Sequence, residues 1–131
     1  ILALASVPPP AELEVRTHER FYVLLEAIQD PGNVGSILRS AAAAGATDIY
    51  LSAGCADAWS PKTLRAAMGA HFRVRIHAGL SDALLEAATE RVSIPMPGGV
   101  ESLNAAAAAA VCVFEKVRQE IAMQTRQMTA D

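Results

Sequence analysis

The chain contains 131 residues, of which 52% are hydrophobic, and its formal net charge is −3. A chain of this size is expected to form one domain whose core needs no disulfide. Its mildly acidic charge counts against a protein that binds nucleic acid over its whole surface. Cys55 and Cys112 form neither a metal-binding spacing nor a redox pair, which fits a reducing, cytoplasmic compartment. The longest apolar run, Ala105–Phe114, is too short to span a bilayer, so no membrane partner is expected, and Cys112 within it is expected to fill the core.

The first part of the chain predicts a linker followed by strands and helices. Residues 1–20 begin apolar, contain three consecutive prolines and then become charged, so we expect a linker from an N-terminal domain outside this chain. The near-continuous apolar residues of 21–28 predict a strand that is buried on both faces. Asn33 is expected to cap a helix over residues 34–44, and residues 47–52 are expected to form the next strand.

The same alternation continues in the second half of the chain. Ser60 is expected to cap a helix that ends near Gly69, with Pro61 in the first turn, where its missing N–H costs nothing. The further expected elements are a strand over 72–76, a helix over 81–89, a strand over 92–94 and a helix from Ser102 to about residue 119 or beyond. Strands and helices that alternate at these lengths predict an α/β fold with a parallel sheet flanked by helices.

In a parallel sheet, ligands bind beyond the carboxyl ends of the strands. Three predicted loops lie there, residues 29–33, 53–60 and 95–101, and each is followed by a helix N-terminus that favours anions. The third loop is a Pro/Gly turn whose unpaired backbone groups are able to hold a flat polar ligand such as an adenine. Ser102 is expected to cap the helix after it. An ordinary connection between a strand and a helix explains the same pattern.

Basic side chains follow the first two loops. Arg39 is the only charge on a helix made mostly of small residues, about a turn and a half after Asn33. Lys62 and Arg65 lie three residues apart on one helix face, close to Ser60, where they are placed to clamp a phosphate. Ordinary solvated side chains are the alternative interpretation for all three basic residues.

The stretch 58–81 contains four Lys or Arg residues and two histidines but no Asp or Glu. Such a local patch is able to meet phosphate although the chain as a whole is acidic, and a solvated face is the alternative. His71 and His77 are too far apart for a ready metal pair, and no metal site is expected. The glycines form neither a phosphate-binding loop nor a dinucleotide-binding fingerprint.

Three segments together resemble the motifs of the SpoU (TrmH-like) RNA 2′-O-ribose methyltransferase family of the SPOUT superfamily. Asp30–Ala41 resembles the first motif, Ser60–Ala70 the second and Ile94–Asn104 the third. Each match is short, and the specific signal is the occurrence of all three in order. The resemblance covers Val23 to about Glu115, and residues 1–10 are similar to the segment that leaves the family's N-terminal substrate-binding domain.

The resemblance implies that residues 21–131 form a SPOUT catalytic domain that transfers a methyl group from S-adenosylmethionine to a ribose 2′-hydroxyl of ribosomal or transfer RNA. It also implies a C-terminal trefoil knot and a homodimer whose partner lies against the cofactor site. By the motif match, the implied cofactor-binding residues are Ile94, Met96, Leu103, Gly79 and Gly98. The implied catalytic residues are Asn33, Arg39, Ser102 and Asn104, and the implied RNA-binding residues are Ser60, Lys62 and Arg65.

The chain departs from the family pattern between residues 78 and 79. Members of the family carry a further helix, a strand and a Gly-x-Glu-Gly-x-Gly-Leu loop between the second and third motifs, whereas here Gly79 and Leu80 follow Ala78 directly. We therefore expect an omitted segment at this junction. A genuine deletion favours an alternative function, a catalytically inactive RNA-binding or dimerisation module of the same fold. A generic nucleotide-binding domain is a third interpretation, which the missing glycine fingerprints disfavour.

Overall fold

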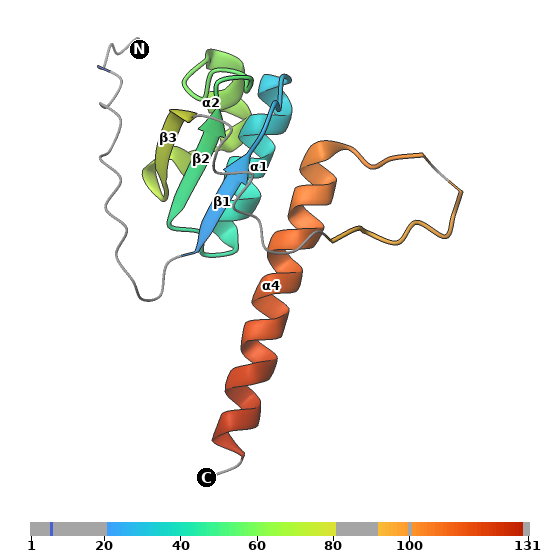
Figure 1. Cartoon of the computed structure of the whole chain (residues 1–131). Helices are drawn as coiled ribbons and strands as arrows, with labels where there is room; N and C mark the ends of the chain where they lie inside the picture. Colours follow the sequence, from blue (N-terminus) through green and yellow to red (C-terminus); the bar gives the residue numbers. More distant parts are fainter. Residues whose placement is uncertain (1–5, 7–20, 81–91, 100, 130–131) are drawn as a thin grey trace.

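The computed structural model describes residues 6, 21–80, 92–99 and 101–129, which form a parallel sheet with helices against it (Figure 1). The strands are β1 (Tyr22–Leu25), β2 (Asp48–Ser52) and β3 (Arg75–Leu80), and they pair in the order β1-β2-β3. The helical segments are α1 (Pro31–Ala43), α2 (Pro61–Ala67), the 3-10 turn η1 (Ala70–Phe72) and α4 (Ala105–Met128). The predicted α/β fold with a parallel sheet and flanking helices is confirmed in these residues, and the trefoil knot stays a prediction.

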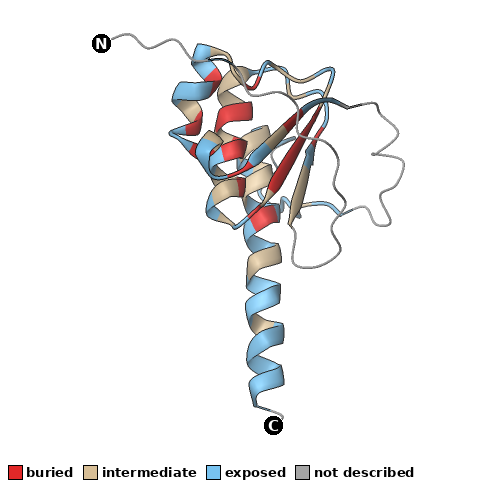
Figure 2. Ribbon diagram, turned by 90° about the vertical axis from the view of Figure 1, so that its left-hand side faces the viewer, coloured by how far each residue is buried: buried red, intermediate tan, exposed pale blue. Residues whose placement is uncertain are grey.

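The main core lies between one face of the sheet and the helices α1 and α2. Ile49 and Leu51 of β2 belong to one buried cluster with Ile37 and Leu38 of α1. Ile49 and Leu51 share a face of β2 because successive strand residues point to opposite sides of the sheet. Figure 2 shows the buried residues concentrated in the strands and in the helices beside them. This packing fixes the position of α1, on which the first sequence motif lies.

Within the described sheet β1 is an edge strand, and the prediction that it is buried on both faces is wrong. Among the described strands it pairs only with β2, and Leu24 keeps 41% of its surface exposed while Leu25 is buried. The central strand is β2, where four of the five residues are buried. A continuous apolar run does not by itself distinguish a central strand from an edge strand, because it does not say how many neighbours the strand has.

The opposite face of the sheet carries a polar cluster around Asp48. Arg75 Nη2 donates to Asp48 Oδ2 at 2.7 Å, and His77 Nε2 lies 3.0 Å from Asp48 Oδ1. The ring of His77 also stacks on Tyr50, with 4.4 Å between the ring centroids. Burial by itself would raise the pKa of Asp48, but the hydrogen bonds from Arg75 and His77 outweigh it and lower the pKa to about 2. Arg75 and His77, two members of the predicted basic patch, therefore bind a buried carboxylate.

Two of the three predicted helix caps are displaced. α1 begins at Pro31 and is capped by Asp30, whose Oδ1 accepts from the backbone N–H of Asn33 at 2.9 Å, so the cap is not Asn33. α4 begins at Ala105 and is capped by Asn104 rather than by Ser102, which is exposed and outside the helix. In both places an Asp or Asn side chain stands where its oxygen reaches the second or third N–H of the helix.

Ser60 caps α2 and Pro61 occupies its first turn, as predicted. The helix ends at Ala67, where Met68 and Gly69 both adopt left-handed conformations with φ of 50° and 84°. These two residues lead the chain from α2 into η1, so the next strand begins later in the sequence. β3 therefore starts at Arg75 rather than at the predicted residue 72.

β3 continues through Ala78 and Gly79, the predicted junction. Ala78 pairs with Leu51 and Leu80 with Ser52, so Gly79, with φ of 80°, is the extra residue of a bulge. The predicted strand over 92–94 is wrong, because these residues are not in a strand. The helix predicted over 81–89 lies outside the described residues.

α4 packs against α1 along its first half and then projects beyond the sheet (Figures 1 and 2). Val113 is the only buried residue among those described in this helix, and Cys112 is exposed, which corrects its predicted place in the core. One turn later, Lys116 Nζ lies 4.1 Å from the centre of the Phe21 ring and ties the helix to the start of β1. No helix in the described part of the chain is long and apolar enough to cross a membrane.

Candidate functional site

Asp30 links the starts of α1 and α2 at the carboxyl end of β1. Its Oδ1 caps α1, and its Oδ2 accepts from Lys62 Nζ at 2.9 Å. The hydrogen bond from Lys62 is the main reason why the pKa of Asp30 lies below its usual value. Because the side chains of Lys62 and Asp30 are 60% and 49% exposed, this ion pair adds little stability. Its effect is to hold the predicted phosphate-binding lysine beside the first motif.

Asn33 and Asn104 join the first motif to the third across 71 residues of sequence. Asn104 Nδ2 donates to Asn33 Oδ1 at 3.0 Å. The Oδ1 of Asn104 accepts from the backbone N–H groups of Ala106 and Ala107 at 2.9 and 3.3 Å. Each polar atom of the Asn104 amide thus has a partner, which fixes the orientation of the side chain. Two of the residues predicted to be catalytic are brought into direct contact.

Gly35 brings the first and second motifs together. A Cβ atom at this position would lie 2.5 Å from the carbonyl oxygen of Thr63 and 2.6 Å from the Cβ of Ala66. Real Cβ atoms essentially never approach other atoms so closely, and only glycine allows α1 and α2 to meet here. The close approach of the two helices therefore depends on the missing side chain of Gly35. The three motifs are therefore mutually positioned by Asp30, Gly35 and the Asn33–Asn104 pair.

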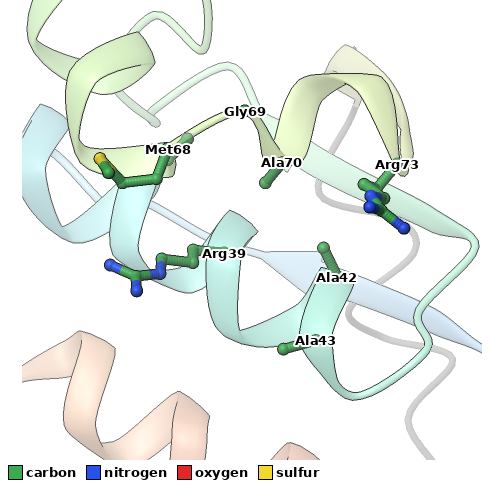
Figure 3. A pocket seen from close by; sticks show the side chains of 8 residues that line it. Arg39, Ala42, Ala43, Met68, Gly69, Ala70 and Arg73 are labelled. Atoms are coloured by element: carbon green, nitrogen blue, oxygen red, sulfur yellow. The ribbon is translucent and has the colours of Figure 1, made fainter.

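Arg39 does not lie in this cluster. An α-helix turns by about 100° per residue, so six residues place Arg39 on a different side of α1 from Asn33. It is exposed and lines an open hollow of about 350 Å³ together with Met68, Gly69 and Arg73 (Figure 3). No ion-pair partner for Arg39 exists among the described side chains. The predicted catalytic arginine thus faces solvent with its charge available to a ligand.

The residues that the resemblance assigns to the cofactor lie mostly on a loop. Figure 1 shows residues 92–99 and 101–104 looping away from the sheet before α4 begins. Ile94 is half-buried, whereas Met96 and Leu103 are 37% and 40% exposed. Gly98 is exposed and has no heavy atom within 4 Å of the place that a Cβ would occupy. Gly79 lies apart from this loop, in β3, and its backbone is equally open.

The residues assigned to RNA have different surroundings. Ser60 lies directly before α2 and caps it, since its Oγ accepts from the Thr63 N–H at 3.3 Å. Lys62 is paired with Asp30, while Arg65 in the last turn of α2 is exposed and has no ion-pair partner among the described residues. His71 points inward, with Nε2 2.7 Å from the carbonyl oxygen of Ala58. Fewer cations of the basic patch therefore lack an ion-pair partner than its sequence indicates, because Lys62 pairs with Asp30 and Arg75 with Asp48.

Asp30 is a residue of the candidate site that the sequence did not single out. It stands directly before Pro31, just as Ser60 stands before Pro61, and an Asp or Ser before a proline is the pattern of a helix cap. The same rule that identified Ser60 would have found it. Among the described residues, no group of three His, Cys, Asp or Glu side chains is arranged to hold a metal ion.

Comparisons with known proteins match these motifs. The sequence model of the SpoU rRNA Methylase family matches residues 20–78 and 77–114. The mitochondrial rRNA methyltransferase 3 of Mus musculus is 46% identical over 81 residues, which cover 58% of this chain and 19% of that protein. The 23S rRNA (guanosine(2553)-2′-O)-methyltransferase RlmP of Bacillus subtilis is 31% identical over 141 residues, which cover 72% of this chain and 57% of that protein.

A solved structure shares the fold. The SpoU methyltransferase AviRb from Streptomyces viridochromogenes, solved in complex with the cofactor AdoMet, superimposes with a TM-score of 0.75 and 26% identity. The match covers 87% of this chain and 63% of AviRb. The chain thus spans about a fifth of the mouse protein and somewhat more than half of the two bacterial ones. Because the family model matches most of its residues, the chain belongs to the SpoU rRNA Methylase family, the family that its three motifs resemble.

Proposed function

We propose that this chain is the catalytic domain of an enzyme that methylates a ribose 2′-hydroxyl of ribosomal or transfer RNA with S-adenosylmethionine. The observation that carries the proposal is the hydrogen bond between Asn33 and Asn104. It joins the motif proposed to face the ribose to the motif proposed to hold the cofactor. The name of RlmP states 2′-O-methylation of rRNA, and AviRb was solved with AdoMet, which supports the same chemistry here.

The surroundings of the loop residues among the proposed cofactor residues support the binding of such a ligand. Gly98 and Gly99 leave open backbone on one side, so a flat adenine ring is able to reach their N–H and C=O groups. The exposed side chains of Met96 and Leu103 offer apolar surface beside it. S-adenosylmethionine supplies a methyl group that is already activated on a sulfonium. The residues of this chain therefore have to hold and orient the reactants, and Ser102 is proposed to complete the site.

We assign the electrostatic role to Arg39. A ribose hydroxyl is a poor nucleophile, and its oxygen gains negative charge as it loses its proton. The guanidinium of Arg39 is effectively always protonated, so it is suited to orient a phosphate and to stabilise this charge rather than to act as a base. Lys62, Arg65 and the N-terminus of α2 at Ser60 are proposed to hold a further RNA phosphate.

The test compares Arg39→Ala with the unchanged chain. Calorimetry with S-adenosylmethionine is expected to give nearly the same affinity for both. Methyl transfer to unmodified ribosomal and transfer RNA, with the ribose position mapped by mass spectrometry, is expected only with Arg39 present. Positioning and electrostatic stabilisation of a reacting group are each worth several kcal/mol, so the loss should exceed about 100-fold. Wild-type turnover in Arg39→Ala would contradict the assignment.

A homodimer is part of the proposal. Phe114, Val117, Ile121 and Met128 recur on α4 at spacings of three, four and seven residues, the period at which apolar residues form a seam between two helices. Phe114, Ile121 and Met128 are 47%, 58% and 82% exposed. The projecting half of α4 thus offers an apolar stripe, and the occupant that we propose for it is the α4 seam of a second copy.

The proposed domain organisation comprises a linker over residues 1–20, a catalytic domain over 21–131 with a knotted C-terminal part, and an omitted segment between 78 and 79. The alignment with RlmP extends over 141 residues but uses about 94 residues of this chain, so about 47 positions face no residue here. The family model also matches in two segments, which meet at residues 77–78. The first observation supports an omission within the aligned region, and the second supports the junction as its position. A cytoplasmic location stays a prediction, because one relative is mitochondrial.

The runner-up function, an RNA-binding or dimerisation module without catalysis, is favoured if the short junction is genuine. Tryptic peptides of the endogenous protein distinguish a genuine short junction from an omitted segment. Cleavage after Arg75 and Arg91 yields a peptide over residues 76–91 if Ala78 is bonded directly to Gly79. We expect instead a peptide that starts at Ile76 and departs from this sequence after Ala78. Detection of the 76–91 peptide alone would support the inactive module.

A further inference from the structure

The hollow beside Arg39 is one part of a longer groove. A second hollow, of about 550 Å³, shares Ala42 and Arg73 with the first. It continues along the loop between α1 and β2 to Phe72 and Arg75. Figure 3 shows Arg39 and Arg73 at opposite ends of the first hollow, with Ala42 and Ala70 between them. The floor consists largely of alanine and glycine, so a chain-like ligand is able to lie close to the backbone.

The groove is positively charged, whereas the net charge of the chain is negative. The net charge of the chain is −3, yet neither hollow is lined by an Asp or Glu residue of the described structure. Arg75 is paired with Asp48, but Arg39 and Arg73 are exposed, and no described carboxylate pairs with either of them. Two free guanidinium groups therefore flank a groove on an otherwise acidic molecule, which favours a polyanionic ligand.

Phe72 adds an aromatic platform beside these charges. Its side chain is 94% exposed, more than that of any other large hydrophobic residue in the described part of the chain. Its backbone is part of η1, where the Phe72 N–H donates to the Gly69 carbonyl at 3.1 Å. An exposed aromatic ring next to arginine side chains is the combination on which unpaired bases stack while their phosphates are neutralised. A base paired in a duplex has no free face for such stacking.

We propose that the groove from Arg39 past Arg73 to Phe72 binds single-stranded RNA next to the reacting nucleotide, with a base stacked on Phe72 and a phosphate at Arg73. This inference rests on the proposed function, because Arg39 is its link to the reacting ribose. Arg73 and Phe72 are RNA-binding residues in this arrangement, and neither takes part in methyl transfer.

The test measures fluorescence anisotropy of a labelled single-stranded oligoribonucleotide of mixed sequence and about 12 nucleotides, a length within the range of single-strand binding sites. Phe72→Ala is expected to weaken binding by about tenfold without changing its salt dependence, and Phe72→Tyr to retain it. Arg73→Gln is expected to weaken binding at low salt and to reduce the slope of log affinity against log salt by about 0.7. Arg126→Gln, an exposed arginine at the far end of α4, is the matched control and should bind as the unchanged chain does.

Several outcomes would overturn the inference: no binding by the unchanged chain, wild-type binding by both Phe72→Ala and Arg73→Gln, or tighter binding of the oligonucleotide when it is annealed to its complement. A change of sedimentation coefficient in Phe72→Ala with unchanged RNA binding would instead make this face a protein interface. Since both side chains are exposed, neither substitution removes core packing.

The inference and the proposed function fail separately. If S-adenosylmethionine binds and RNA is methylated while the Phe72 and Arg73 variants behave normally, the groove assignment is wrong and the methyltransferase stands. If the oligonucleotide binds through Phe72 and Arg73 while calorimetry detects no cofactor, the groove stands and the proposed methyl transfer is wrong.

Discussion

Asp48 is a buried carboxylate that stays ionised because its partners lie on the neighbouring strand. Its side chain is 2% exposed, and Arg75 and His77 reach it from β3. The alternation of β3 places these two side chains on the same face, two residues apart. The sequence showed four basic residues and two histidines in one stretch, but it did not show that part of this charge is turned toward a carboxylate 27 and 29 residues away.

Acid is therefore expected to destabilise the protein through Asp48. Its pKa is about 2 in the folded chain and near 3.8 when unfolded, so its stabilisation is complete above pH 4 and is lost as the pH falls toward 2. Chemical denaturation as a function of pH should show a loss on the order of 2 kcal/mol over this range that is absent in Asp48→Asn. Glu101→Gln, in the exposed loop, should keep the wild-type profile. The same acid profile in Asp48→Asn and the unchanged chain would refute this role.

At the scale of single elements, the sequence located helices better than it located their first residues. A candidate cap residue before each helix predicts α1, α2 and α4, and for α4 the run of alanines adds to the signal. Residue type predicts Ser60, Asn33 and Ser102 as caps, and only Ser60 is one. Asp30 and Asn104 have equally suitable side chains one turn or less away, and local rules do not rank such neighbours.

The cap of α4 is open to a direct test with two neighbouring variants. Asn104→Ala removes two hydrogen bonds to helix N–H groups and should lower the free energy of unfolding by about 1 kcal/mol. Ser102→Ala should change it by less than about 0.5 kcal/mol, because Ser102 is exposed and outside the helix. Urea denaturation measures both values. The opposite ranking would mean that α4 begins at Ser102, as the sequence predicts.

Strands were harder to predict than helices for a physical reason. β3 was predicted three residues early because Phe72 is apolar, yet its side chain is exposed in η1. Residues 92–94 are apolar enough for a strand, but a strand exists only when another strand lies beside it. Whether a partner is present depends on residues far away in sequence. The same dependence explains why the sequence predicts the three site motifs and a loop at Met96, but not that this loop projects away from the sheet.

At the scale of the whole molecule, the projecting half of α4 predicts self-association. Ile121→Glu places a charge in the seam formed by Phe114, Val117, Ile121 and Met128, and should shift the protein from dimer to monomer in sedimentation experiments. Because Ile121 is 58% exposed in the single chain, the variant should remain folded. Gln127→Glu introduces the same charge on the exposed helix, about 120° away from the seam, and should remain dimeric. Equal sedimentation of the two variants would exclude the seam as the dimer contact.

The strand order β1-β2-β3 also has a consequence for how the molecule forms during synthesis. Each strand pairs with the one that precedes it, at a separation of 26 residues for Tyr22 and Asp48 and 27 for Asp48 and Arg75. The sheet can therefore assemble in the order in which the ribosome releases it, and α1 and α2 close its core as they emerge. We expect residues 21–80 to protect their amides from exchange while α4 is still inside the ribosomal tunnel. The contact between Asn33 and Asn104 then forms after the sheet, so the candidate site is completed only once α4 has left the tunnel.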